Sequence, residues 1–415
     1  MVNFIFVLAA GLLVVVVGFV LADKATKSVT IKISVSPSTT AATPKASQSA
    51  TPKPVISVSE KIQEGLAMLK KSAPLGYVLQ KSSSSALVKK QIALAVLNMN
   101  TGGVFEKRIW VNEADIKNYS VSGSITVTPD LADEYLDIQP KEWNSFNSYF
   151  EIIGHPEMMI VANKYLLLSS SLQSLPERTG KTFTDIVYVP FSPALENNEI
   201  ISAGKNYLNK IVDEAFQKLS AKNIEALSSP GGFVTSVVNE KFLKNVLLIE
   251  HIDPDSYSVA GDNGKALAEK TLTIIGTNQT HAYRYTGSPA GANGLAQFIK
   301  STYDKISSNY PTAGLNGDYY LGMADHVNAV EAMILFFDYY KSDIQKKINI
   351  PLIISDEMLV ASYNGGTTPV IKSINKYGAN WLSAQVNLPD DQRILQPETI
   401  NYLQKYRSMT ALKIF

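Results

Sequence analysis

The sequence contains no cysteine, only four histidines and almost no excess of either charge. Without cysteine the chain can form no disulfide, no thiolate metal site and no cysteine nucleophile. Four scattered histidines also argue against a zinc cluster. The 38 lysines and arginines nearly cancel the 37 aspartates and glutamates, so the basic footprint of nucleic-acid-binding proteins is missing. We therefore expect no metal, no cofactor and no nucleic-acid partner.

The composition is otherwise that of a folded protein with more than one part. At 415 residues the chain is longer than one typical domain, so two or three parts are expected. Apolar residues make up 45% of the sequence, which is enough for most of the chain to fold. Composition and patterning divide the chain into residues 1–22, 23–58, 59–199 and 200–415.

An uninterrupted apolar run, Phe4 to Ala22, is close to the ~20 residues that span a bilayer as a helix. It predicts a transmembrane anchor or a signal segment over residues 1–22, and we favour a retained anchor. Cleavage remains an alternative, because Val20 to Ala22 has the character of a signal peptidase site. Lys24 and Lys27 follow the run, which by the positive-inside rule would keep the rest of the chain in the cytoplasm.

The next segment, Ser36 to Pro54, consists almost entirely of Ser, Thr, Pro and Ala. Such a composition cannot bury enough apolar surface to fold, and its prolines keep the chain extended. We therefore predict a semi-stiff tether over residues 23–58, which would let the following part reach away from a membrane surface.

Residues 59–199 mix two apolar patterns and carry no motif that identifies a function. Ser85 to Asn98 has its apolar residues at helical spacing, whereas Ser120 to Pro129 alternates as a strand does. We expect an ancillary α+β region of unknown role.

From Ile200 onward the periodicity is mainly helical. The segment Ile200 to Ser220 places Leu208, Ile211, Val212, Ala215 and Leu219 on one face. A second helix is predicted over Phe233 to Ile252, and Pro254 should end it because proline disfavours helical geometry at the preceding residue.

Glu250 is the candidate catalytic residue of this region. It would lie in the last turn of the second helix, directly after the apolar residues Val246 to Ile249. Burial against apolar neighbours raises the pKa of a carboxyl, and the negative end of a helix acts in the same direction. A raised pKa suits a general acid. Asp253 and Asp255 follow in a turn with proline and are interpreted as capping or loop residues.

Three segments follow Glu250 in a fixed order. They are Ser288 to Phe298, SPAGANGLAQF; Ala361 to Gly366, ASYNGG; and Pro397 to Tyr402, PETINY. They resemble the S-x-x-G-A-x-G-L-M-Q, A-A-Y-N-A-G and E-T-x-x-Y motifs of the lytic transglycosylases and goose-type lysozymes, the SLT-domain family. The resemblance covers roughly residues 200–406, and the helical pattern of residues 326–340 fits the helix between the second and third motifs.

The resemblance implies a mainly α, lysozyme-like catalytic domain over residues 200–415, with Glu250 as the catalytic residue. It implies peptidoglycan glycan strands as the substrate, cut at the MurNAc-GlcNAc β-1,4 bond with a 1,6-anhydro product. The substrate-binding residues would be Ser288, Gly294, Gln297, Tyr363 and Asn364, and the Tyr363 hydroxyl would also hold the Glu250 carboxyl. Because peptidoglycan lies outside the cytoplasmic membrane, we expect a single-pass protein whose catalytic domain faces the cell wall.

The chain departs from the family pattern in places that leave alternatives open. His251 stands where the family usually has Ser after its Glu, and Ala296 stands in place of Met. The connection over residues 255–287 is longer than usual, and we interpret it as a surface loop rather than a flap over the cleft. Phe298 and Tyr303 fit packing roles and sugar platforms equally well. The alternatives in function are a hydrolytic muramidase, a non-catalytic peptidoglycan-binding protein and an anchored scaffold that faces the cytoplasm.

Overall fold

The computed structural model describes residues 56–82, 85–123, 125–129 and 136–415. The predicted anchor, residues 1–22, lies outside these ranges, and so does the predicted tether apart from its last residues. No helix within the described ranges combines the length and apolar character that crossing a membrane requires. The anchor and the tether therefore stay predictions.

The first described part is built around antiparallel sheets. The larger sheet has the strand order β4-β3-β2-β7-β8, with β1 paired to part of β2, and β5 and β6 form a separate pair. The elements are α1 (Val58–Lys71), β1 (Tyr77–Leu79), β2 (Leu87–Asn98), β3 (Val104–Asn112), α2 (Glu113–Ser122), β4 (Val127–Pro129), β5 (Ile138–Glu142), β6 (Tyr149–Ile152), β7 (Met158–Leu168) and β8 (Phe183–Tyr188).

The prediction of a helix over Ser85 to Asn98 is wrong, because this segment forms the central strand β2. Leu94 and Val96 belong to the core on one face of the sheet, and Ala95 and Leu97 to the core on the other face, where α1 packs. A strand that is buried on both faces is apolar throughout instead of alternating. Its pattern therefore cannot be told from that of a buried helix by periodicity.

The prediction of a strand over Ser120 to Pro129 is right only at its end. Helix α2 occupies the start of this segment, and Gly123, with φ of 64°, ends the helix in a left-handed conformation. The strand β4 then covers Val127–Pro129 and pairs with β3. Gly123 therefore separates a helix from a strand within a segment that the alternating pattern predicts to be one strand.

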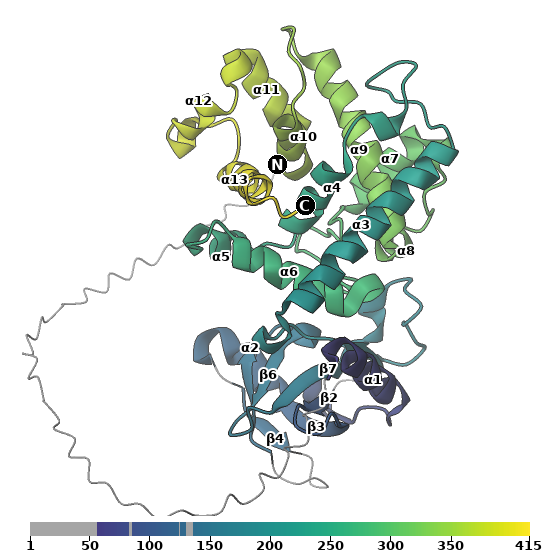
Figure 1. Ribbon diagram of the computed structural model, residues 1–415, viewed down its shortest axis with the longest axis vertical. Coiled ribbons are helices and arrows are strands. Elements are labelled where there is room, and N and C mark those ends of the chain that lie inside the picture. The colour runs from purple at the N-terminus through teal and green to yellow at the C-terminus, as the bar shows by residue number, and fades with distance from the viewer. Residues whose placement is uncertain (1–55, 83–84, 124, 130–135) are drawn as a thin grey trace, which may run out of the picture. The chain divides into compact units, whose positions relative to one another are not determined.

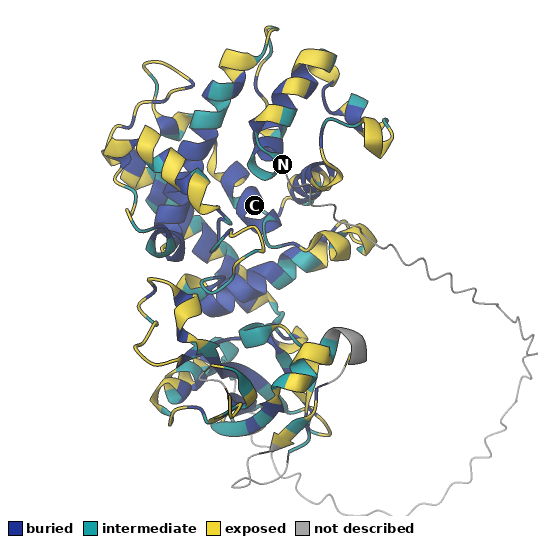
Figure 2. Ribbon diagram, turned by 180° about the vertical axis from the view of Figure 1, so that it is seen from behind, coloured by how far each residue is buried: buried dark blue, intermediate teal, exposed yellow. Residues whose placement is uncertain are grey.

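The rest of the described chain is helical, which confirms a mainly helical fold preceded by a region of mixed structure. The helices are α3 (Asn198–Ala221), α4 (Glu240–Ile249), α5 (Pro254–Val259), α6 (Lys265–Asn278), α7 (Lys300–Asn309), α8 (Tyr319–Ala324), α9 (His326–Lys347), α10 (Asp356–Gly365), α11 (Thr367–Tyr377), α12 (Ser383–Val386) and α13 (Pro397–Leu412). The helices predicted over residues 200–220 and 326–340 are confirmed as α3 and α9. Helix α9 is buried along most of its length and packs against α3, α4, α7, α8, α10 and α11. In Figure 2 the helices of this part carry their exposed residues mainly on the outside.

The second predicted helix, over Phe233 to Ile252, is too long at both ends. The structure has a short 3₁₀ turn at Val234–Ser236, and α4 begins only after Asn239, whose side chain accepts a hydrogen bond of 2.8 Å from the Phe242 N–H. Helix α4 ends at Ile249, which makes Glu250 its C-cap residue. Pro254 does not end this helix but begins the next one, α5.

The connection over residues 255–287, predicted as a surface loop, lies at the surface only in its first part, and most of its second part belongs to the core. It forms α5 and α6, and α6 is buried from Thr271 to Asn278 as it packs along α3. Asn278 also exchanges two hydrogen bonds of 2.9 Å with the backbone of Val189, just after β8. In Figure 1, α6 lies between the sheet and most of the other helices, and α3 runs from α6 along α9. The supposed insertion therefore joins the sheet to the helical part.

Candidate active site

The site is built at the C-terminal end of α4, where Glu250 follows an apolar helix. Leu247, Leu248 and Ile249 are fully buried, so the carboxyl of the next residue, Glu250, lies at the edge of the core. Burial is the main cause that raises the pKa of Glu250, from an ordinary 4.5 to about 7. The carboxyl is therefore a proton donor and a proton acceptor near neutral pH.

Glu250 lines a cavity of about 380 Å³, within the size range of small-ligand sites. Four of the five residues that the resemblance assigns to substrate line the same cavity: Ser288, Gln297, Tyr363 and Asn364. These residues come from the loop before α7 and from α10, far from Glu250 in the sequence. The apolar part of the wall includes Phe298, Ile299 and Phe336, and Glu398 adds a second carboxyl. The fold thus gathers all three motif segments around one carboxyl.

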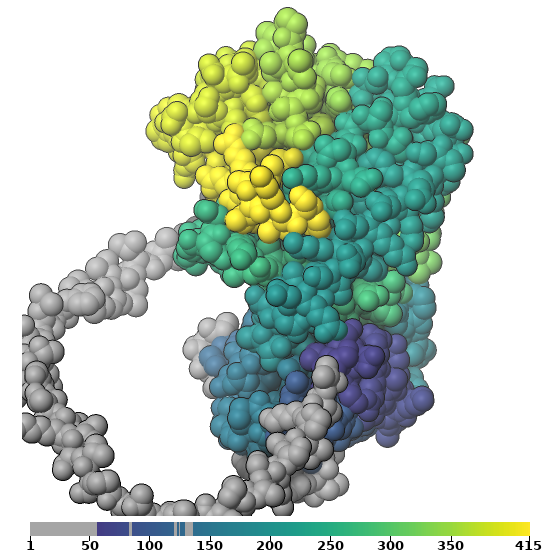
Figure 3. Space-filling model, in the orientation of Figure 1, coloured from purple at the N-terminus to yellow at the C-terminus, as the bar shows by residue number. Residues whose placement is uncertain are grey.

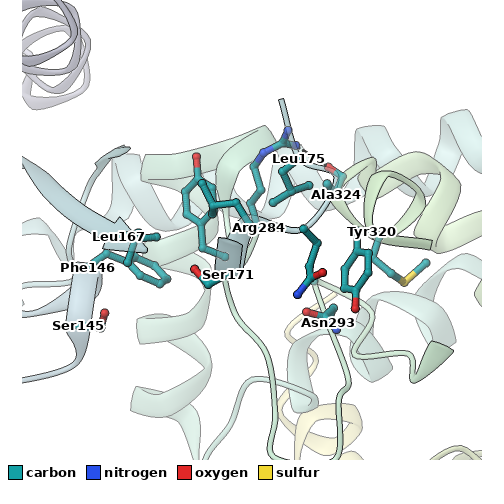
Figure 4. A pocket seen from close by; sticks show the side chains of 14 residues that line it. Ser145, Phe146, Leu167, Ser171, Leu175, Arg284, Asn293, Tyr320 and Ala324 are labelled. Atoms are coloured by element: carbon teal, nitrogen blue, oxygen red, sulfur yellow. Dashed lines mark hydrogen bonds between the residues drawn. The ribbon is translucent and has the colours of Figure 1, made fainter. Parts of the chain in front are cut away.

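Gly294, the fifth of these residues, does not line this cavity. It lines a smaller one of about 170 Å³ on the side of the loop that faces the sheet part, together with Phe146, Arg284 and Tyr320 (Figure 4). A Cβ at Gly294 would lie 2.5 Å from the backbone oxygen of Met323, and its φ of 70° also favours glycine. Close packing of the loop explains this glycine without a ligand.

The Gln297 side chain closes its own turn. Its Nε2 donates to the Gly294 carbonyl at 2.6 Å, and its φ of 50° places the residue in the left-handed region. Ser288 acts similarly, since its Oγ accepts a hydrogen bond of 3.0 Å from the Ala292 N–H. Both side chains shape the glycine-rich loop, and both residues line the cavity.

Tyr363 does not hold the Glu250 carboxyl as predicted, because its hydroxyl donates to the Ala296 carbonyl. The hydroxyl that donates to Glu250 Oε1 belongs to Tyr402 on α13. Burial and the nearby Glu250 raise the pKa of Tyr402 well above its ordinary value, so this hydroxyl stays protonated as a donor. Sequence reasoning treated Tyr402 only as the last residue of a motif.

A second residue of α13 that the sequence analysis missed is Lys405, which lies one turn beyond Tyr402. Residues three and four apart share one face of a helix, so Glu398, Tyr402 and Lys405 all lie on the side of α13 that faces α4. Tyr402 and Lys405 are buried, while other atoms of α13 are exposed at the surface (Figure 3). The helical spacing of these three polar residues is the sequence feature that could have indicated their place beside Glu250.

His251, the residue after Glu250, is hydrogen-bonded to the glycine-rich loop. Its Nε2 lies 2.8 Å from the Leu295 carbonyl, which can only accept, so Nε2 carries the hydrogen. The ring stacks on Tyr283 with centroids 3.5 Å apart. Burial lowers the pKa of His251 to about 3, which keeps the ring neutral at ordinary pH. His251 therefore orders the cavity wall and supplies no proton.

The remaining candidate residues make hydrogen bonds that support the fold around the cavity or cap a helix. Asn364 Oδ1 accepts a hydrogen bond of 2.9 Å from Thr399, which orients the amide at the cavity. Tyr303 is buried and donates to the Asn316 carbonyl at 2.7 Å, so its role is packing. Asp253 caps α5 by accepting from the Ser256 N–H at 2.7 Å, as expected for a capping residue. Within the described ranges, no group of three or more His, Asp or Glu side chains could hold a metal ion.

Comparisons of the chain with models of protein families, with curated proteins and with solved structures gave no match.

Replacing Tyr402 by Phe is expected to raise the pKa of Glu250 above about 7. The Tyr402 hydrogen bond lowers this pKa, because it stabilises the carboxylate more than the neutral acid. The carboxyl resonance of Glu250, followed by ¹³C NMR through a pH titration, measures the change. Tyr303→Phe removes a buried hydroxyl elsewhere in the same core and should leave the titration unchanged. An unshifted Glu250 pKa in Tyr402→Phe would contradict the hydrogen bond described here.

Proposed function

We propose that this chain is a peptidoglycan lytic transglycosylase in which Glu250 acts first as general acid and then as general base. The observation that carries the proposal is the cavity itself. A carboxyl with a pKa of about 7 shares its walls with residues of all three segments that resemble the family's motifs. The lysozyme-like character of the helical part belongs to the same proposal.

The reaction uses the two protonation states of Glu250 in turn. Near pH 7 both states are well populated, since the pKa lies there. The neutral acid gives its proton to the glycosidic oxygen of the MurNAc-GlcNAc bond, and the bond from that oxygen to the MurNAc anomeric carbon breaks. The resulting carboxylate takes the proton of the C6 hydroxyl of the same MurNAc, whose oxygen then bonds to the anomeric carbon. The products are a free hydroxyl on GlcNAc and a 1,6-anhydro end.

The surroundings of Glu250 suit this alternation. Tyr402 donates a hydrogen bond to the carboxylate that forms after the first proton transfer. The positive charge of Lys405 also favours that carboxylate, whereas burial favours the neutral acid. Gln297, Tyr363 and Asn364 would orient the acetamido and hydroxyl groups of the sugar at the wall of the cavity.

One observation favours hydrolysis as a second candidate function. Glycosidases that deliver water use a pair of carboxyl groups, and Glu398 lines the same cavity as Glu250. In that case Glu398 would activate water, and the product would carry a reducing end.

We place the catalytic domain outside the cytoplasm as part of the same proposal. Its support is the location of the substrate together with the apolar run at residues 4–22 and the tether-like composition that follows it. The membrane would then hold the protein through its N-terminal helix, while the tether lets the domain reach the glycan strands.

Mass spectrometry of the muropeptides that the full chain releases from purified peptidoglycan tests the function. We expect 1,6-anhydro ends, and a rate that falls above about pH 7 as Glu250 loses its proton. Reducing ends would instead support the muramidase, with Glu398 as the partner of Glu250. Binding to peptidoglycan without any release would support a glycan-binding protein.

A further inference from the structure

Lys405 is a lysine that the fold buries next to the candidate catalytic carboxyl. Only 4% of the residue is exposed, which is rare for lysine unless the ammonium group has partners. Its Nζ donates to the Ile249 carbonyl at 3.1 Å and to the Ile252 carbonyl at 2.8 Å. These two carbonyls lie on either side of Glu250 in the chain. One side chain of α13 therefore holds both ends of the short segment that carries the carboxyl.

The position of this ammonium group follows from the end of α4. The last carbonyls of a helix lack their usual partners and form the negative end of the helix dipole. A lysine that donates to such carbonyls satisfies them and is attracted by the dipole. Burial lowers the pKa of Lys405, while Glu250, Asp253 and Glu398 favour its charged form.

The charged and titratable groups around Glu250 have opposite effects on its carboxylate. From α13, Glu398 disfavours a carboxylate at Glu250, whereas the Tyr402 hydroxyl and the Lys405 ammonium favour it. On α10, the partly buried Tyr363 lies near the same carboxyl, but its hydroxyl donates to the Ala296 carbonyl. His251 is neutral and bonded to the glycine-rich loop. Lys405 is thus the cation that opposes Glu398 at this carboxyl.

We propose that Lys405 is a positioning residue for Glu250, which fixes the backbone on both sides of it and stabilises the carboxylate that forms after proton transfer. The effect of Lys405 on catalysis rests on the proposed function. Its effect on the placement and charge of Glu250 does not. Lys405 does not line the cavity that Glu250 lines. It acts through the placement and the charge state of the residue that does.

The test compares Lys405→Met with Lys405→Arg and with a matched control, Lys164→Met. Lys164 has the same 4% exposure and also donates to two backbone carbonyls, those of Ser72 and Ala73, but it lies in the sheet part. ¹³C NMR titration of the Glu250 carboxyl and the pH dependence of muropeptide release are measured for each protein. Urea unfolding gives the stability of each.

For Lys405→Met we expect the Glu250 pKa to rise by about one unit, since an adjacent opposite charge commonly shifts a carboxyl by ~1–3 units. The alkaline limb of the pH-rate profile should move upward with it, and kcat at pH 6 should fall by ~10-fold with little change in KM. Lys405→Arg should restore most of both properties because it keeps the charge. Lys164→Met should lower stability and leave the pKa and the pH profile in place.

An unshifted Glu250 pKa in Lys405→Met, with a loss of stability like that of Lys164→Met, would overturn the inference and make Lys405 purely structural. Should Lys405→Met fail to fold, Lys405→Gln keeps a donor without the charge and carries the same expectation for the pKa. The titration needs no substrate, so it separates the two proposals. A shifted pKa in a protein that never releases muropeptides would support the role of Lys405 and reject the transglycosylase.

Discussion

Replacing Glu250 by Gln is expected to lower the release of anhydro-muropeptides by ~10²–10⁴-fold, the range associated with loss of general acid-base catalysis. The amide has nearly the shape of the carboxyl and its oxygen can still accept the hydrogen bond of Tyr402, but it has no proton to give. Initial rates of release from purified peptidoglycan, followed by mass spectrometry, measure the effect.

The matched control for this variant is Glu240→Gln. Glu240 lies at the other end of α4 with half of its side chain exposed, and it does not line the cavity with Glu250. This variant should release muropeptides at the rate of the unaltered protein. Full activity in Glu250→Gln would move the catalytic role to another carboxyl, and Glu398 would be the first to replace.

Glu250→Gln should also make the protein more stable at neutral and alkaline pH. The folded-state pKa of Glu250, about 7, is above the ordinary 4.5, so the unfolded chain loses this proton first as pH rises. The contribution of the neutral carboxyl is complete below about pH 4.5 and is lost as pH rises to about 7. Gln does not titrate, so the variant should gain up to about 3 kcal/mol over the unaltered protein above pH 7. Urea unfolding at pH 4.5 and pH 8 measures the difference, which should vanish at the lower pH.

The second large effect is expected from Gly276→Ala, which should cost about 3 kcal/mol or more in the free energy of unfolding. A Cβ at Gly276 would lie 2.2 Å from the backbone oxygen of Ile200, and one at Gly204 would lie 2.1 Å from that of Leu272. These contacts are to backbone, so no side-chain rotation relieves them. Helices α3 and α6 must move apart, although the Asn278 hydrogen bonds to Val189 hold α6 against the sheet part.

Gly261→Ala is the control for this change. Gly261 precedes α6, and a Cβ there would meet no atom within 4 Å, so the midpoint of urea unfolding should stay near that of the unaltered protein. A Gly276→Ala protein with an unchanged midpoint would show that α3 and α6 do not pack as closely as described. Such a result would restore the interpretation of residues 255–287 as a surface loop.

The sequence alone determined those features that depend on neighbouring residues. The helices over residues 200–220 and 326–340 are long enough for their apolar spacing to show the helical period. The apolar run before Glu250 indicated a carboxyl at the edge of a core, and burial does raise its pKa to about 7. The proline after Asp253 indicated a capping or loop residue, and Asp253 does cap α5.

The tertiary structure decided those features that depend on residues far apart in the chain. Strand β2 is buried on both faces, and only its neighbours in the sheet distinguish it from a helix. The sequence of residues 255–287 indicates an insertion, whereas in the structure α6 of this segment packs against α3. Tyr402, which bonds to the Glu250 carboxyl, and Lys405, which bonds to the backbone beside it, lie more than a hundred residues away on the last helix. Periodicity reports which face of an element is apolar, but the partner that each polar side chain meets is set by how the elements pack.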